Sequence, residues 1–342
     1  MSFTYFYYII IISEMTGSNS METRPRQKYI APFLVVIAGA CWGFIGFFTK
    51  NLTAIGFSAI QIGFLRVVSA AVLIWLYILI FEREKAKISL KDIWLFFGTG
   101  ILSITLFSVL YFMTIQITAI SFAAVLLYTA PCFVMILSAI LFHEKIGAVK
   151  ITALVLAFIG CLCTTGLLES LIGGSGLGRF SKLGILTGIG SGLGYALYSI
   201  FGTAALKKYD TVTVTAYTFL MASAALLPFC AHKEFFDLFK RAGALTNIAG
   251  ITLLSTLLPY LLYTQGLKYT KPGRASILAF SEPLVATLTG LIIFREKLTA
   301  GGIAGMLLIF ASIVILNSKR MNRKEKPARR NKHKPKGNNR GY

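Results

Sequence analysis

Charged side chains are scarce in this sequence, and acidic ones are the scarcest. Asp, Glu, Lys and Arg make up 14% of the 342 residues, against about 25% in soluble domains. Acidic residues number only 13, whereas 34 are basic and 56% of the chain is apolar. So few charges cannot hydrate the surface of a soluble protein of this length, so we expect a membrane protein.

Cysteine and histidine are too scattered to form a metal or redox site. Cys161 and Cys163 are spaced C-x-C, not C-x-x-C as in metal and thioredoxin-like sites. All five cysteines lie in apolar segments, where we interpret them as small packing residues. The three histidines, His143, His232 and His333, lie in expected loops or in the tail. We therefore expect no metal, no cofactor and no catalytic residue.

The sequence also lacks any polar stretch long enough for a soluble catalytic domain, and apolar runs fill most of the chain. A hydrocarbon core about 30 Å thick requires about 20 helical residues. The runs predict an all-α integral membrane protein with ten transmembrane helices. Their expected ranges are 30–49, 58–81, 93–115, 119–141, 147–168, 183–205, 211–231, 245–267, 273–294 and 299–317.

One stretch of the sequence is written twice, at residues 121–145 and 273–297, with a shift of 152 positions. Matched pairs are Ala123 and Ala275, Pro131 and Pro283, Phe142 and Phe294, Glu144 and Glu296, Lys145 and Lys297, and, upstream, Tyr111 and Tyr263. Each half then holds five helices, an odd number, so the halves cross the membrane in opposite directions. Such inverted repeats are typical of secondary transporters, in which a substrate site lies between the repeats.

The repeat predicts the domain boundaries. Residues 29–168 and 183–317 form the two five-helix repeats, and 169–182 form a linker that contains Gly173, Gly174 and Gly176. Residues 1–28 form an N-terminal extension, in which Met15 or Met21 is the expected initiator. Residues 318–342 form a basic tail that is too polar to fold.

The net charge of +21 has a topological explanation. Lys and Arg are concentrated in the N-terminal segment, in alternate loops on that side, and in the tail. The positive-inside rule therefore places both termini in the cytoplasm, and we expect a multi-pass protein of the plasma membrane. The tail is expected to contact anionic lipid headgroups, and no nucleic-acid partner is expected.

Two prolines occupy matching positions inside their expected helices. Pro131 and Pro283 each remove one backbone hydrogen bond and release the carbonyl four residues earlier, at Leu127 and Ala279. A released carbonyl at membrane depth is tolerated next to protein or a wet cavity. Two interpretations stay open: kinked helices that line a substrate path, and kinks that serve packing.

Two charged residues lie deep inside expected helices, Glu282 and Arg66. A charge at the bilayer centre costs about 2.5–3.5 kcal/mol on insertion scales. Glu282 is either a coupling carboxylate or ligand for a cationic solute, or a structural anchor paired with Arg66. Arg66 is either a structural cation or a clamp for an anionic group.

Aromatic residues gather on the helices expected to line a cavity. Tyr and Trp combine an apolar ring with one polar atom, which suits amphiphilic solutes. The candidate substrate-binding residues are Trp42, Tyr111, Tyr128, Tyr195, Tyr198, Tyr260, Tyr263, Gln265, Ser281 and Glu282, with Gln61 and Gln116 as weaker candidates. Glycines at four-residue spacing, such as Gly39 and Gly43, allow helices to approach closely. The Glu-Lys pairs after the doubled helices are interpreted as solvated ends, with gates as the alternative.

Together these motifs resemble the drug/metabolite transporter superfamily (DMT), and within it the EamA-type ten-helix exporters. The motifs are Cys41-Trp42-Gly43, Lys50, Leu65-Arg66, Pro131 with Glu144-Lys145, and Ser281-Glu282-Pro283 with Glu296-Lys297. The resemblance spans roughly residues 30–317. It implies ten helices around a central cavity, and export of amino acids, metabolites or drugs by exchange or proton antiport.

The leading hypothesis is an exporter of a small polar or amphiphilic metabolite, with the lipid bilayer and protons as further partners. An importer or nucleotide-sugar exchanger of the same superfamily is an alternative, although a doubly charged phosphate would require more cations than Arg66. Two other classes stay open. An intramembrane enzyme would need a facing nucleophile and base, or a metal, and a scaffold would leave the repeat unexplained. Both a monomer and a homodimer fit the sequence.

Overall fold

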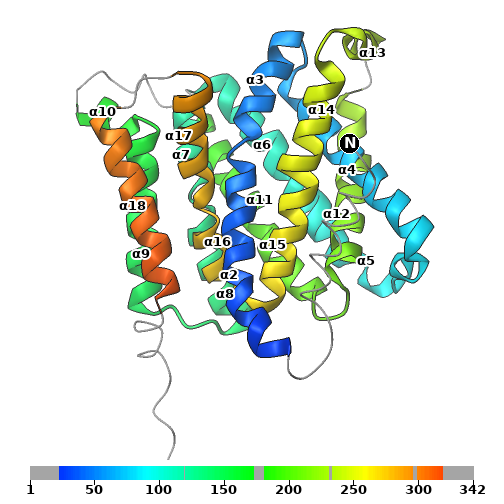
Figure 1. Ribbon diagram of the computed structural model, residues 1–342, viewed down its shortest axis with the longest axis horizontal. Coiled ribbons are helices and arrows are strands. Elements are labelled where there is room, and N and C mark those ends of the chain that lie inside the picture. The colour runs from blue at the N-terminus through cyan, green and yellow to red at the C-terminus, as the bar shows by residue number, and fades with distance from the viewer. Residues whose placement is uncertain (1–22, 119, 173–180, 231–232, 296–298, 319–342) are drawn as a thin grey trace, which may run out of the picture.

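The computed structural model describes residues 23–118, 120–172, 181–230, 233–295 and 299–318, and these ranges contain helices but no strand (Figure 1). Eight described helical segments are long and apolar enough to cross a membrane. Two shorter apolar helices, Ala148–Thr164 and Thr211–Leu226, complete the set. Within the described residues the expected all-α fold with ten transmembrane segments is confirmed.

The first half contains five transmembrane segments, three of them interrupted. They are α2 (Thr23–Trp42) with α3 (Ile45–Ile55); α4 (Ala59–Phe81); α5 (Ile93–Phe97) with η3 (Gly98–Thr105) and α6 (Leu106–Ile117); α7 (Ile120–Leu127) with α8 (Ala130–Phe142); and α9 (Ala148–Thr164). The sequence predicted a single helix over 30–49. Instead the helix starts at Thr23, within the expected extension, and is interrupted after Trp42.

The second half repeats this order. Its segments are α11 (Lys182–Ala205); α12 (Thr211–Leu226); α14 (Ala244–Thr252) with η6 (Leu253–Leu257) and α15 (Leu258–Tyr269); α16 (Pro272–Leu278) with α17 (Ser281–Ile293); and α18 (Ala300–Asn317). Short helices occupy the connections: η1 (Arg83–Ala86), η2 (Leu90–Asp92), α10 (Leu167–Ile172), η4 (Leu227–Phe229), α13 (Lys233–Asp237) and η5 (Leu238–Lys240). The glycines of the expected linker lie outside the described residues.

The repeat is visible in backbone irregularities as well as in sequence. The third segment of each half contains a π-helical stretch, η3 or η6. In each stretch a threonine hydroxyl donates to the carbonyl five residues earlier, from Thr105 to Gly100 at 3.1 Å and from Thr256 to Ile251 at 2.9 Å. The fourth segment of each half is broken next to its proline.

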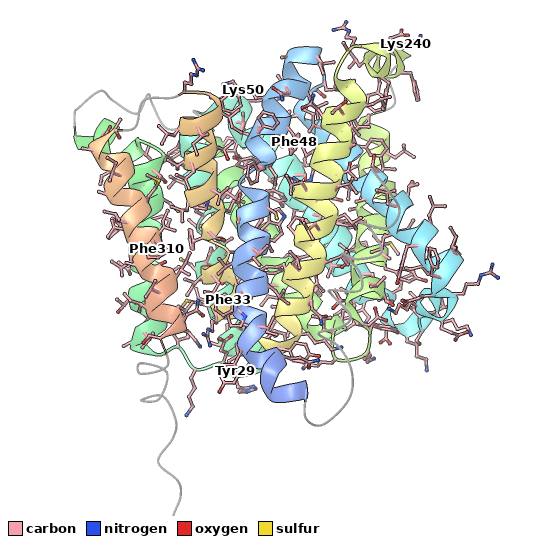
Figure 2. The ribbon with its side chains drawn as sticks, in the orientation of Figure 1. Tyr29, Phe33, Phe48, Lys50, Lys240 and Phe310 are labelled. Atoms are coloured by element: carbon pink, nitrogen blue, oxygen red, sulfur yellow. The ribbon has the colours of Figure 1, made fainter. Side chains whose placement is uncertain are left out.

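The two halves interlock instead of forming separate domains. The most extensive helix contacts are those of α2 with α15, α11 with α6, α4 with α12, and α9 with α18. Every one of these pairs joins a helix of the first half to a helix of the second. In Figure 1, α2 and α15 lie side by side near the centre, and α9 and α18 pair at one edge. Large apolar side chains such as Phe33 and Phe310 are exposed and point away from the bundle (Figure 2).

Alternate connections meet at the same end of the bundle, as ten crossings require. At one end Lys208 donates to Asp92 at 2.5 Å, and this hydrogen bond raises the pKa of Lys208. At the other end Asn51 donates to Asn247 at 3.0 Å. We call the end with Asp92 and Lys208 the inner end, because the positive-inside rule predicts it to face the cytoplasm. The end with Asn51 and Asn247 is the outer end.

Candidate functional site

The two broken helices meet in the middle of the molecule around a small cavity, the break cavity. It is lined by Leu127, Tyr128, Ala130, Pro131, Tyr195, Ser276, Ala279, Phe280 and Glu282. Tyr128 and Phe280 are related by the 152-residue shift, and their ring centroids lie 5.8 Å apart. Equivalent residues of the two halves therefore contact each other here, as expected at the axis that relates inverted repeats.

The breaks follow from the prolines and are stabilised locally. Since Pro283 has no N–H to donate to Ala279, that carbonyl accepts instead from the Glu282 backbone N–H at 3.0 Å. In the first half, Thr129 Oγ1 donates to the Leu126 carbonyl at 2.6 Å. The prolines thus produce a clean interruption in each helix, where the sequence predicted kinks.

Glycines on the first helix of each half allow close packing against the break of the other half. A Cβ atom on Gly39 of α2 would lie 2.7 Å from the Ala279 carbonyl oxygen, and one on Gly192 of α11 would lie 3.0 Å from that of Leu126. Ser281 donates to the Val36 carbonyl of α2 at 2.7 Å. The positions that the sequence marked as glycine contacts therefore hold the breaks in place.

A second small cavity shares Tyr195 with the first and has mainly aromatic walls; we call it the aromatic cavity. It is lined by Trp42, Ser103, Ile104, Phe107, Tyr195, Tyr198, Ser199, Tyr260 and Tyr263. The Trp42 ring centroid lies 6.2 Å from Tyr195, 5.4 Å from Tyr260 and 5.3 Å from Tyr263. Tyr195 lines both cavities, so its ring separates a compartment with a carboxylate from a compartment of aromatic rings.

Two hydroxyl groups in the aromatic cavity are bonded within the protein. Tyr198 shares a hydrogen bond of 2.5 Å with Thr264, and Tyr263 shares one of 2.7 Å with Ser199. These bonds fix the two rings between α11 and α15. The rings therefore form a preformed, largely apolar wall between α11 and α15.

Glu282 projects from the first turn of α17 into the break cavity. Among the described residues its carboxylate forms no hydrogen bond and no ion pair. Arg66 of α4 interacts electrostatically with both Glu282 and Tyr260. The direct Glu282–Arg66 salt bridge considered from the sequence is thus not formed within the described part of the chain.

The remaining predicted residues are not among those that line the two cavities. Tyr111 stacks on Phe107, with centroids 5.9 Å apart. Gln265 accepts a hydrogen bond of 2.6 Å from Thr211. Gln61 forms a capping box with Ser58 at the start of α4, and Gln116 is exposed.

Sequence analysis missed several lining residues. Phe280 could have been found, because the 152-residue shift pairs it with Tyr128. Ser276 and Ser199 carry no such signal, since single serines are common in membrane helices. Ile104 lies in the π-helical stretch η3 and Phe107 lies in the first turn of α6 directly after it, and no sequence pattern predicted that irregularity.

The family model of the EamA-like transporter family matches residues 29–166 and 182–318. An uncharacterized transporter of Archaeoglobus fulgidus is 36% identical over 207 residues, covering 60% of this chain and 70% of its own length. A second uncharacterized transporter of that organism is 29% identical over 299 residues, covering 86% of this chain and 100% of its own. The transporter YxxF of Bacillus subtilis is 23% identical over 293 residues, covering 85% and 90%.

A solved crystal structure of a protein shares the fold. It superposes with a TM-score of 0.73 over 86% of this chain and 99% of its own, at 15% sequence identity. At this identity the likeness establishes the arrangement of helices and nothing about the solute.

Proposed function

The chain belongs to the EamA-like transporter family, and from this membership we propose that it is a proton-coupled exporter of a small amphiphilic solute with a cationic group. The observation that supports the proposal is the unpaired carboxylate of Glu282 at the meeting point of two inverted repeats. Inverted-repeat transporters bind solute near the bilayer midplane and expose the site to the two sides in turn. The plasma membrane, with both termini in the cytoplasm, is the proposed location.

The surroundings of Glu282 support a role in binding over a role as anchor. A structural carboxylate in a membrane protein is normally paired, because an uncompensated charge is costly there. Glu144 of this chain shows the paired arrangement, with Lys150 as its partner at 2.9 Å. Glu282 has no such partner among the described residues and faces the break cavity. A proton or the cationic group of a solute would compensate the charge of the Glu282 carboxylate.

The aromatic cavity supports the proposed solute class. Rings of Trp42, Tyr195, Tyr260 and Tyr263 offer flat apolar faces next to the Glu282 compartment. Aromatic faces also attract cations, by about 0.5–2 kcal/mol. A solute with an apolar body and an amino group would place its body among the rings and its amino group at the carboxylate.

Competition between a proton and the solute for the Glu282 carboxylate would couple solute export to proton entry. Protonation of Glu282 removes the charge that attracts the cationic group, so a proton and the solute exclude each other. Protons that enter from outside would release the solute outward, and solute from the cytoplasm would displace the proton inward. Neither cavity has a lysine or arginine among its lining residues, which disfavours a nucleotide-sugar phosphate as the solute.

Transport by protein in liposomes tests the proposal. With an acidic lumen, we expect the protein to accumulate amphiphilic amines from a panel of amino acids and small aromatic amines. Glu282→Gln should lower gradient-driven accumulation at least tenfold, since a hydrogen bond to a charged group contributes about 1.5–3 kcal/mol. It should retain exchange of solute without a gradient.

Asp92→Asn is the matched control, since Asp92 lies at the inner end, away from both cavities. It should transport like the parent. Gradient-driven accumulation that Glu282→Gln leaves unchanged would contradict the proposed coupling site. A protein that moves no amine but moves an anionic solute would contradict the solute class.

A further inference from the structure

The buried carboxylate of Glu144 joins three elements at the inner end. Its Oε1 accepts from Lys150 Nζ at 2.9 Å, and its Oε2 accepts from the Gly273 backbone N–H at 3.1 Å. The Glu144 and Lys150 side chains are only 4% and 9% exposed. Glu144 follows α8, Lys150 lies in the first turn of α9, and Gly273 lies in the first turn of α16. The solvated helix end expected from the sequence is therefore wrong for Glu144.

The local backbone directs Glu144 toward α16. His143 adopts the left-handed conformation with φ of 52°, and the following Glu144 N–H donates back to the Ser138 carbonyl at 3.1 Å. Arg295, the matching residue of the second half, has φ of 54°. Since a non-glycine residue seldom adopts this conformation, its presence at both matching positions marks a defined turn.

The site around Gly273 has no spare room. A Cβ atom there would lie 3.2 Å from Glu144 Oε2 and 3.3 Å from Met135 Cγ. Lys150 Nζ is held by a second acceptor, the Lys145 carbonyl, at 2.5 Å. The charges are thus compensated inside a closely packed contact, as a buried ion pair requires.

This contact is present at one end only. At the inner end α8 packs against α16, whereas at the outer end the described residues of α7 and α17 form no comparable contact. The shift of 152 relates Lys150 to Gly302, so the second half has no lysine at the corresponding position. The inner ends of the two broken helices are therefore joined by the hydrogen bond from Gly273 to Glu144, and Lys150 compensates the charge of this carboxylate.

We propose that Glu144, with Lys150 and the Gly273 N–H, is the latch that closes the break cavity toward the cytoplasm. Opening to the inner side requires α8 and α16 to separate, and their separation breaks the Glu144–Gly273 bond. The bonds of Glu144 to Lys150 and to the Gly273 N–H stabilise the closed state. They therefore set the population of the state in which the cavity is open to the inner side. The proposal rests on the proposed transport cycle for its role, but the opening itself can be measured without any solute.

A cysteine at Ser276 reports the opening. Ser276 lies in α16, lines the break cavity and is only 6% exposed. Membrane vesicles of known orientation carry Ser276→Cys, and a membrane-impermeant maleimide is added on the inner side. The same protein with Ser276 intact gives the background from the native cysteines. We expect slow labelling in the parent and labelling about tenfold faster with Glu144→Gln, a change that corresponds to a tenfold shift in population.

Two further variants make the test decisive. Lys150→Gln removes the ion pair but leaves a hydrogen-bond donor, and it should also accelerate labelling; it provides the test if Glu144→Gln does not fold. Lys208→Met breaks the Asp92–Lys208 ion pair at the same end but away from α8 and α16, and it should label like the parent.

Equal labelling rates for the parent, Glu144→Gln and Lys150→Gln would overturn the latch, and so would equal acceleration by Lys208→Met. Transport in liposomes separates this outcome from failure of the proposed function. If the protein transports amines but the Glu144 and Lys150 variants label like the parent, the proposed function is supported and the latch is contradicted. If the Glu144 and Lys150 variants label faster but the protein transports no solute, the latch is supported and the proposed function is contradicted.

Discussion

Glu144 and Glu282 have the same side chain but different surroundings, which give their carboxylates different numbers of partners. Glu144 has a lysine and a backbone N–H as partners and little exposed surface. Glu282 lines a cavity, and within the described residues nothing bonds to its carboxylate. Because an unpaired charge in the membrane is costly, the proposed function gives Glu282 a proton or a solute as its partner, whereas Glu144 is paired within the described residues.

Tyr195 is the residue shared by both cavities, so it tests whether one solute occupies them together. It forms edge contacts with Trp42 and Phe107, at 6.2 and 5.5 Å. We expect Tyr195→Ala to weaken solute affinity about tenfold, or ~1.4 kcal/mol, the scale of an aromatic contact. Tyr195→Phe keeps the ring and should bind like the parent. Competition binding to protein in detergent measures both, and equal affinities for all three proteins would contradict a solute that spans the two cavities.

At the scale of elements, the broken helices form because proline and glycine act together across the two halves. Pro283 interrupts the helix, and Gly39 of the opposite half allows α2 to approach the interruption. The arrangement needs both residues, since a side chain at position 39 would overlap with Ser281 and the Ala279 carbonyl. Discontinuous helices of this kind surround the binding sites of many transporters.

Replacement of these glycines tests the packing. Gly39→Val should destabilise the protein by about 2 kcal/mol or more, because overpacking a closed contact costs about 1–3 kcal/mol. Gly46→Ala is the control, since no atom lies within 4 Å of a Cβ there. It should be neutral or stabilise by up to about 1 kcal/mol, because alanine favours a helix over glycine. Thermal unfolding in detergent measures both, and equal losses of stability would contradict the close contact.

At the scale of the whole molecule, the two repeats are not two independent bodies. The most extensive contacts of α2, α4, α6 and α9 are with helices of the opposite half. The proposed transport cycle exposes the site between the repeats to the two sides of the membrane in turn. Because neighbouring helices belong to opposite halves, a moving unit would have to combine helices from both, such as α2 with α15.

Interlocked halves predict that neither folds alone. Residues 1–176 and 177–342 expressed separately should each be degraded, because the apolar surfaces that pack against the opposite half are left uncovered. Expressed together, the two fragments should assemble and copurify through a tag on one of them. Immunoblots of membranes and affinity purification measure these outcomes. Two fragments that accumulate separately and do not copurify would contradict the interlocked fold.

The sequence by itself determined the membrane class, the ten segments, the inverted repeat and the place of the prolines. Each of these features depends on composition, on segment length or on a fixed shift along the chain, all of which can be read from the sequence. The bilayer constrains them strongly, because a segment that crosses it must be apolar and must satisfy its own backbone hydrogen bonds. It also singled out Glu282 and most of the aromatic side chains, because charges and tyrosines are conspicuous in an apolar chain.

Only the tertiary structure decided which of these residues meet. Tyr195 lines both cavities, Gln265 accepts a hydrogen bond from Thr211 outside them, and Arg66 forms no salt bridge with Glu282 within the described residues. Glu144 turned from an expected solvated end into a buried contact with the opposite half. The physical reason is that these contacts join residues far apart in the chain, by 54 positions for Thr211 and Gln265 and by 129 for Glu144 and Gly273, or depend on local π-helical stretches and helix breaks. Packing alone sets the rotation of each helix about its axis. That rotation decides which residue of a neighbouring helix each side chain contacts.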